Sequence, residues 1–315
     1  MFKIVLAIAL LASVQVLTAQ DRSAAPDQLR QKVIIDTDIG DDVDDAFAVA
    51  LAVRSPELDI LGITTTFGDT ELRARILDRF LRETGHSGIA IAAGKRTDTS
   101  SALTQRAYAE RNAPGVPHLD AVDFMLRRIQ QNPGEITLIA IGPLVNIGAL
   151  IDKDRAAFRK LRRVVLMGGS VAHGYGDLGY TKQRGPEPEW NIKNDVPAAQ
   201  KLFASGVPIF MMPLDSTQLK LDEVKRAILF QAGTPLTDAL TLLYHEWGQQ
   251  TPTLFDAMAV AYAVVPDLCP TAAMHISVEA DGMTRREHGE PNAAVCLNSD
   301  PETFFRFYIP RVIAR

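Results

Sequence analysis

The hydrophobic positions of this chain form short continuous runs that alternate with longer amphipathic segments. This alternation is typical of a single α/β domain with a mostly parallel, doubly wound, Rossmann-like sheet and helices on both faces. The runs predict buried strands at Val33–Asp36, Ile60–Thr65, Ile89–Ala92, Ile136–Ala140, Arg163–Met167 and Val207–Met211. The segments between them predict helices at Asp45–Val53, Leu72–Thr84, Leu119–Gln130, Gly142–Ile151 and Ala198–Ser205.

The last third of the chain departs from this alternation. Residues Ala272–Glu279 and Ala293–Leu297 predict a late β-pair, and Pro301–Ile313 predicts a terminal amphipathic helix. The stretch His173–Glu189 is rich in Gly, Pro and charge, which favours a long surface loop of the kind that is often functional. No repeat or low-complexity linker interrupts residues 32–315, so we expect one domain there.

The N-terminus has the layout of a secretory signal peptide at residues 1–19, followed by a polar lead-in at 20–31. Lys3 precedes an apolar stretch from Ile4 to Leu17, and Ala19 offers a small residue before a cut. An uncleaved anchor or a buried first helix is the alternative, although the stretch is short for a membrane span. We therefore expect an exported protein, periplasmic or secreted, without stable membrane insertion after processing.

Charge and cysteine content narrow the classes further. The formal net charge of −5 argues against nucleic acid or an anionic membrane as a partner. The two cysteines, Cys269 and Cys296, could pair in an exported protein, or they could remain thiols, since pairing depends on their geometry.

Six aspartates lie between Asp36 and Asp45, directly after the apolar run Val33-Ile34-Ile35. They occupy a strand-to-helix turn at the carboxyl end of a strand, where α/β proteins place ligands. So many like charges repel one another, and Ca²⁺ or Mg²⁺, which prefer oxygen ligands, would relieve that repulsion. A solvated turn that caps the helix is the alternative, but a cap needs only one or two acids.

Further polar motifs follow other predicted strands and should open on the same edge of the sheet. Two later acids, Glu189 and Asp256, could join them, although Asp256 taken alone would be a plain N-cap of a helix at Ala257–Val265. In chain order, the motifs are Asp36-Thr37-Asp38-Ile39-Gly40, Asp44-Asp45-Ala46, Thr64-Thr65-Thr66-Phe67-Gly68-Asp69, Gly142-Pro143-Leu144-Val145-Asn146, Met167-Gly168-Gly169, Glu189-Trp190-Asn191 and Asp256.

This ordered set resembles the inosine-uridine-type nucleoside hydrolase family, with matches from Ile34 to about Pro266. The resemblance implies hydrolysis of the N-glycosidic bond of a nucleoside to give ribose and free base, and often a homo-oligomer. It also implies a bound Ca²⁺, whose ligands would be the carboxylates of Asp38, Asp45 and Asp256 and the carbonyl of Val145. A Ca²⁺ ion lowers the pKa of the attacking water, and Asp38 is the candidate general base.

Substrate contacts are carried over in the same way. Asp44, Glu189 and Asn191 would hold the ribose hydroxyls, and Asp256 would serve both metal and sugar. Asp69, Met167 and Trp190 are further candidates for substrate contact. The surrounding carboxylates would stabilise an oxocarbenium-like transition state.

The chain departs from the family pattern at several positions. The aspartate turn is two residues longer, so Asp41 and Asp42 are extra, and Asp42 would take the place of Asp44 or Asp45 if no gap were placed. Trp190 replaces the usual Phe, and Phe255 replaces the His of the late His-Asp pair. The earlier His-Gly motif is also missing, the sequence there being Arg106-Ala107-Tyr108-Ala109-Glu110.

Without those histidines the leaving base must be activated differently. Trp247 could stack on a purine, and His245 could act as a general acid; alternatively, Trp247 is a core residue and His245 a surface one.

Three other functions remain open on the sequence. A haloacid-dehalogenase-like phosphatase also begins with a strand and Asp-x-Asp, but the later Lys and paired acids of that family are not convincingly present. A calcium-dependent nucleoside- or sugar-binding protein would keep the site without catalysis. A hydrolase of another ribosylated compound would keep both fold and chemistry.

Overall fold

The computed structural model describes residues 30–97, 101–111, 117–176 and 185–314. The predicted signal peptide, most of the lead-in and residues 177–184 of the predicted loop lie outside the described residues. Within the described ranges no helix is long and apolar enough to cross a membrane.

A mostly parallel sheet runs through the molecule, as the alternation of apolar runs and amphipathic segments predicts. The strands from β4 to β7 are parallel, β10 is parallel to β7, and the β8–β9 hairpin is antiparallel. The described part of the sheet has the order β4 (Leu119–Asp120), β3 (Ile91–Ala93), β2 (Leu58–Thr65), β1 (Gln31–Thr37), β5 (Thr137–Ile141), β6 (Arg163–Met167), β7 (Ile209–Met212), β10 (Ala293–Val295), β8 (Ala272–Val278) and β9 (Thr284–Glu287).

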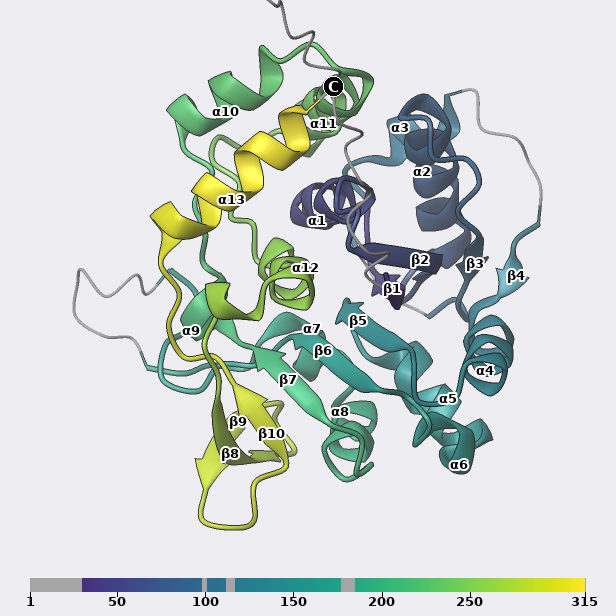
Figure 1. Cartoon of the computed structure of the whole chain (residues 1–315), viewed down its shortest axis with the longest axis vertical. Helices are drawn as coiled ribbons and strands as arrows, with labels where there is room; N and C mark the ends of the chain where they lie inside the picture. Colours follow the sequence, from purple (N-terminus) through teal and green to yellow (C-terminus); the bar gives the residue numbers. More distant parts are fainter. Residues whose placement is uncertain (1–29, 98–100, 112–116, 177–184, 315) are drawn as a thin grey trace, which may run out of the picture.

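Helices cover both faces of the sheet (Figure 1). On one face lie α1 (Asp44–Val53), α2 (Thr70–Glu83), α3 (Arg106–Glu110), α10 (Glu223–Phe230), α11 (Pro235–Trp247), α12 (Ala257–Val264) and α13 (Pro301–Ile313). On the other lie α4 (Ala121–Gln131), α5 (Val145–Lys153), α6 (Arg155–Phe158) and α8 (Val196–Phe203). Three short elements, α7 (Trp190–Lys193), α9 (Leu214–Thr217) and η1 (Pro266–Leu268), lie in connections.

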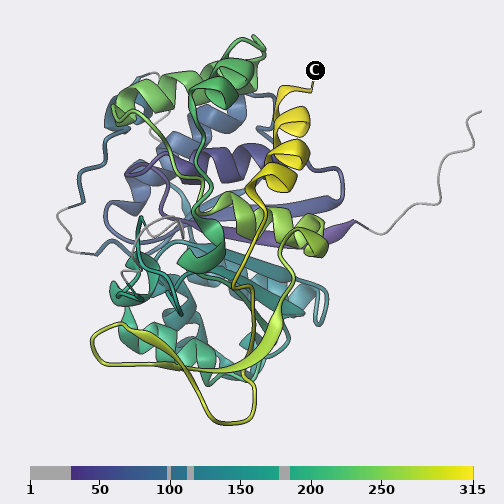
Figure 2. The same cartoon turned by 90° about the vertical axis from the view of Figure 1, so that its left-hand side faces the viewer.

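Each helical layer buries its own apolar core against the sheet. One core joins α1, α12 and α13 to β1 and β5, and the other joins α4, α5 and α8 to the opposite face. Figure 2 shows the same arrangement from the side, with α13 lying against the layer that contains α12. Because side chains alternate along a strand, neighbouring residues of β1 enter different cores: Ile35 belongs to the first and Ile34 to the second.

Aspartate side chains begin many of these helices. Asp69, Asp120, Asp195 and Asp222 each accept a hydrogen bond from the backbone N–H three residues later, which satisfies an otherwise unpaired donor of the first turn. Asp256 also precedes a helix, α12, but its side chain accepts no capping bond from the described backbone. Asp256 therefore occupies the N-cap position of α12 without capping the helix through its side chain.

Most predicted elements are present with shifted ends. The predicted helix at Gly142–Ile151 begins only at Val145, because Gly142 lies in a turn pressed against the loop after β1. The predicted late pair forms as β8 and β10, and the additional strand β9 pairs with the other side of β8. Helix α10 was not predicted at all.

The cysteines form a disulfide between Cys269 and Cys296, with Cα atoms 5.7 Å apart. Both are fully buried at the edge of the first core, where the bond ties the segment after η1 to the segment after β10. Of the two states that the sequence left open, the chain adopts the paired one.

Candidate active site

The order of the sheet reverses at β1, which lies between β2 and β5. In open α/β sheets such a switch point creates a crevice at the carboxyl ends of the strands. A cavity of about 300 Å³ lies there. Its acidic lining consists of Asp38, Asp41, Asp42, Asp44, Asp45, Glu189 and Asp256, and the other lining residues are Ile141, Met167, Tyr175, Trp190, Asn191, Lys193 and Phe255.

Three buried carboxylates form a tight group in this cavity. One side-chain oxygen from each of Asp44, Asp45 and Asp256 lies within 4.8 Å of the others. Asp45 also accepts a hydrogen bond from the hydroxyl of Thr37. Burial, followed by the charge of the neighbouring acids, raises the pKa of all three well above the ordinary value.

This donor set fits a divalent cation. Oxygen-only ligands are what hard cations such as Ca²⁺ and Mg²⁺ prefer, and a cation would remove the mutual repulsion that burial aggravates. Among the described residues, Lys193 is the one basic side chain in the cavity lining. The tight group differs in one residue from the carboxylate ligands that the resemblance implies. Asp44 belongs to it, whereas Asp38 lines the same cavity outside it.

Asp38 sits where the turn after β1 meets the turn after β5. A Cβ atom on Gly142 would lie 2.8 Å from the backbone N of Asp38, so glycine is required for this close approach. The indole Nε1 of Trp190 donates a hydrogen bond to Oδ2 of Asp38 at 3.3 Å. Burial raises the pKa of Asp38 to about 6, although the Arg73 guanidinium acts in the opposite direction.

Glu189 organises the short helix α7 and thereby places its neighbours. Its carboxylate is buried and accepts hydrogen bonds from the backbone N–H groups of Gly169, Asn191 and Ile192, at 2.8–3.1 Å. Burial raises its pKa to about 7 in spite of these bonds. The amide of Asn191 donates to the carbonyl oxygen of Met167, the last residue of β6, at 3.1 Å. The Glu189-Trp190-Asn191 motif is thus fixed to the end of β6.

Asp36 lies fully buried beneath the aspartate turn. Its Oδ1 accepts hydrogen bonds from Thr64 Oγ1 at 2.5 Å and from Asn146 Nδ2 at 2.8 Å. Its Oδ2 has no hydrogen-bond partner among the described residues. Burial raises the pKa of Asp36 to about 7. Asp36 therefore links the end of β1 to the end of β2 and to the first turn of α5.

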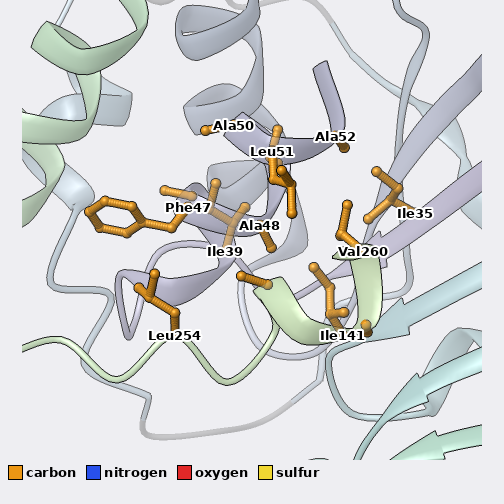
Figure 3. Close-up of a cluster of buried hydrophobic side chains, with 14 of the residues drawn as sticks. Ile35, Ile39, Phe47, Ala48, Ala50, Leu51, Ala52, Ile141, Leu254 and Val260 are labelled. Carbon is orange, nitrogen blue, oxygen red and sulfur yellow. The ribbon is translucent and has the colours of Figure 1, made fainter. Parts of the chain in front are cut away.

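The apolar side of the aspartate turn anchors it to the first core (Figure 3). Ile39 lies among Phe47 and Leu51 of α1, with Ile141 of β5 and Val260 of α12 in the same cluster. All five are fully or almost fully buried. Packing on one side thus directs the aspartates of the turn toward the cavity on the other.

Not every residue that the sequence suggested lines the cavity as the described residues form it. Asp69 caps α2 and pairs with Arg96 at 3.3 Å. Trp247 is a core side chain of α11, 8 % exposed, and His245 is exposed on the same helix. Val145 begins α5, outside the lining. Asp42 does line the cavity, and its Oδ1 accepts a hydrogen bond from the N–H of Val43 at 2.6 Å.

Several lining residues escaped the sequence interpretation. Tyr175 and Phe255 pack edge to face, with ring centroids 5.8 Å apart, and Trp190 N donates to the Tyr175 hydroxyl at 3.0 Å. Tyr175 stands in the loop whose length suggested a function, and Phe255 precedes Asp256, so both carried a positional signal. Lys193 had none beyond closeness to the Glu189-Trp190-Asn191 motif.

A buried cavity at the switch point of such a sheet is where α/β enzymes place their active sites. Comparison with known proteins shows which class of enzyme this one is. The model of the family described as inosine-uridine preferring nucleoside hydrolase matches residues 33–306. The pyrimidine-specific ribonucleoside hydrolase RihA of Citrobacter koseri is 30% identical, over 86% of this chain and 95% of the relative.

Solved structures give the same result. A plant nucleoside hydrolase, PpNRh1, superimposes with a TM-score of 0.78 at 25% identity, covering 90% of this chain and 99% of the other. A purine-preferring ribonucleoside hydrolase from Gardnerella vaginalis superimposes with a TM-score of 0.77 at 25% identity, covering 90% and 98%. The chain belongs to the inosine-uridine preferring nucleoside hydrolase family.

Proposed function

We propose that this enzyme is a Ca²⁺-dependent N-ribosyl hydrolase that converts nucleosides to ribose and free base. One observation carries the proposal: carboxylate oxygens of Asp44, Asp45 and Asp256 converge within 4.8 Å in a cavity that Asp38 also lines. Family membership supports the reaction type, and the all-oxygen donor set supports the choice of cation.

The proposed ligands are the carboxylates of Asp38, Asp45 and Asp256 and the carbonyl of Val145, and the tight group adds Asp44 as a candidate. When bound, the cation would hold ribose hydroxyls and lower the pKa of the attacking water. Asp38 would accept the proton of that water, because its carboxylate lines the same cavity as the tight group.

The remaining polar residues would hold the sugar. Asp44, Glu189 and Asn191 line the cavity and would contact the ribose hydroxyls, and Asp256 would contact both sugar and cation. As the C–N bond breaks, positive charge develops on the ribose ring, and the surrounding carboxylates would stabilise it.

Aromatic side chains would receive the base. Tyr175, Trp190 and Phe255 supply flat apolar surface to the cavity, on which purines or pyrimidines can stack. The relatives divide on this point, one being named for pyrimidines and another for purines. We therefore propose a ribonucleoside substrate, and the activity assay on different nucleosides determines which base is preferred.

The disulfide supports the proposal that the enzyme is exported. Disulfides such as that between Cys269 and Cys296 persist in oxidising compartments and are rare in the cytosol. The mass of the protein recovered from the periplasm or medium would test this directly. Loss of about the first 19 residues is expected, and an intact N-terminus in the cytoplasm would contradict it.

The function is tested by reducing-sugar release from inosine, adenosine, guanosine, uridine and cytidine, with and without a strong Ca²⁺ chelator. We expect ribose release from at least one nucleoside, loss of that release with chelator, and its recovery on adding Ca²⁺. Asp38→Asn should abolish release, whereas Asp152→Asn, which changes an exposed aspartate on α5, should not.

Each failure has a distinct meaning. Unchanged release by Asp38→Asn would remove Asp38 from the general-base role. Activity that persists in chelator would remove Ca²⁺. Silence on all five nucleosides, with Ca²⁺ still bound, would point to a different ribosylated substrate or to a binding protein.

A further inference from the structure

A fully buried arginine stands directly behind the aspartate turn. Arg73 belongs to α2, and its side chain has no solvent exposure. Burying a guanidinium is costly unless its donors are satisfied, so its contacts show what it stabilises. Its hydrogen bonds go to the turns that follow β1 and β2, apart from one at 3.4 Å to the hydroxyl of Ser101.

The first set of contacts fixes the main chain of the turn after β1. Nη1 of Arg73 donates to the carbonyl oxygens of Asp38 and of Ile39, the latter at 3.0 Å. Nη2 donates to Oδ2 of Asp41 at 2.8 Å, forming an ion pair in which the arginine is fully buried and the aspartate is partly exposed. The guanidinium therefore fixes two residues at once: Asp38, the proposed general base, and Asp41, the first extra residue of the turn.

The second contact fixes the turn after β2. Nε of Arg73 donates to the carbonyl oxygen of Phe67 at 2.7 Å. Phe67 has φ of +61°, a left-handed conformation that is unfavourable for an aromatic residue. Its ring packs edge to face on Trp190, whose indole donates to Asp38. Arg73 thus reaches Asp38 by two routes, through its backbone and through its side-chain partner.

Asp41 and Asp42, the two extra residues of the turn, also make contacts on the side opposite Arg73. Oδ1 of Asp41 accepts a hydrogen bond from Leu103 N at 2.7 Å, and its carbonyl accepts one from Thr104 Oγ1 at 2.6 Å. The amide of Gln105 donates to the carbonyl of Asp42 at 2.6 Å. The longer turn is therefore held between α2 and the segment 101–105.

We propose that the Arg73–Asp41 pair is a positioning device that holds the aspartate turn in its cation-binding conformation before the cation arrives. This inference rests on the proposed function, because it assumes that the turn binds Ca²⁺. Arg73 contacts neither substrate nor cation in this scheme; it acts through Asp38, Ile39 and Asp41.

A second explanation is that Arg73 acts through its charge alone. This explanation predicts a change in Ca²⁺ affinity of the opposite sign when Arg73 is replaced. A buried guanidinium near the site repels a cation, so removing its charge should tighten Ca²⁺ binding if charge were its main effect. Loss of positioning should weaken binding instead. Substitutions that separate charge from geometry therefore decide between the two explanations.

The experiment measures Ca²⁺ affinity by titration calorimetry on the full chain carrying Arg73→Met, Arg73→Lys or Asp41→Asn. Positioning predicts binding about 10- to 100-fold weaker in both Arg73 variants, the range seen when a partner that orients metal ligands is lost. Asp41→Asn should lie between these variants and wild type, because the three carbonyl contacts of Arg73 remain. Circular dichroism establishes that each variant is folded.

Arg226→Met is the matched control. Arg226 is also buried, and it donates to a backbone carbonyl, that of Leu221, at 2.7 Å, in a place remote from the cavity. It should lose thermal stability as Arg73→Met does, with unchanged Ca²⁺ affinity. A general loss of stability would lower affinity in both, which would overturn the positioning role.

Other outcomes also decide the matter. Tighter binding in Arg73→Met with wild-type binding in Arg73→Lys would show that only charge matters and overturn the inference. Equal affinity in all variants would overturn it too, while leaving the proposed function intact. Absence of Ca²⁺ binding by the wild-type chain would instead overturn the metal part of the proposed function, and this inference with it.

Discussion

The indole of Trp190 donates a hydrogen bond to Oδ2 of Asp38 across 3.3 Å, joining the helix after β6 to the turn after β1. The bond leaves the other carboxylate oxygen of Asp38 for a second partner. The bond requires the indole N–H, which phenylalanine in the same place would lack.

Trp190→Phe should lower kcat by about tenfold. Phe keeps an aromatic ring at the cavity wall and near Phe67, but it cannot donate to a charged carboxylate, and such bonds contribute about 1.5–3 kcal/mol. Steady-state kinetics on the best nucleoside measures the effect. Trp247→Phe is the control, because Trp247 is a core residue outside the cavity lining and its kinetics should not change. A wild-type kcat for Trp190→Phe would show that the bond is not used.

Asp256→Asn and Asp45→Asn should each weaken Ca²⁺ binding by at least about tenfold, since each removes a charged oxygen from the tight group. Asp69→Asn is the matched control. Asp69 caps α2, and Asn also caps helices well, so its affinity for Ca²⁺ should stay near wild type. Calorimetry on the three proteins tests the assignment, and equal affinity in Asp256→Asn would remove that residue from the ligand set.

In chelator, the enzyme should lose stability as pH rises from about 4 to about 7. Burial raises the pKa of Asp36 and of Glu189 to about 7, so in this window the folded state binds more protons than the unfolded chain. The free energy of unfolding therefore falls with rising pH and levels off above the raised pKa values. Surface acids with lowered pKa values, such as Glu57, act in the other direction at lower pH.

Thermal melts in chelator at several pH values measure this slope. Saturating Ca²⁺ should reduce the loss, because the cation favours the ionised carboxylates. Asp36→Asn should flatten the slope, since Asn keeps an acceptor for Thr64 and Asn146 without titrating. A melting temperature that rises between about pH 5 and 7 in chelator would contradict the prediction.

Replacing both cysteines by Ala should lower the free energy of unfolding by about 3–4 kcal/mol, because the bond closes a loop with a sequence separation of 27 residues. Denaturant unfolding of Cys269→Ala/Cys296→Ala measures the loss, and wild-type protein with reductant is the comparison. Neither cysteine lines the cavity, so kcat at moderate temperature should be unchanged. A large fall in kcat for the folded double variant would show that the bond also supports the site.

Much of the fold could be predicted from sequence because its signals are local. Strand β6 and helix α13 lie at the predicted residues, since apolar periodicity and the capping Asp300 mark them without reference to other parts of the chain. Helix α10 escaped because its exposed face carries Val224 and Ile228, which obscures the amphipathic pattern.

The candidate site also contains residues that could be predicted from the sequence and residues that could not. Asp38, Glu189 and Asn191 could be named because each belongs to a motif that resembles the family pattern. Trp247 looked like a base contact because it precedes Asp256 by few residues, but α11 directs its side chain into the core. The apolar periodicity of the sequence does not distinguish a Trp247 side chain that faces the cavity from one that faces the core.

By itself, the sequence determined that acids cluster at the carboxyl end of a buried strand in an α/β sheet, because strand and helix periods are local properties of the chain. Only the tertiary structure decided that Asp44, and not Asp38, joins Asp45 and the distant Asp256 in the tight group, and that Arg73 supports the turn from behind. The pairing of Cys269 with Cys296 was decided in the same way. Such contacts depend on how distant elements pack, and packing is a property of the whole core.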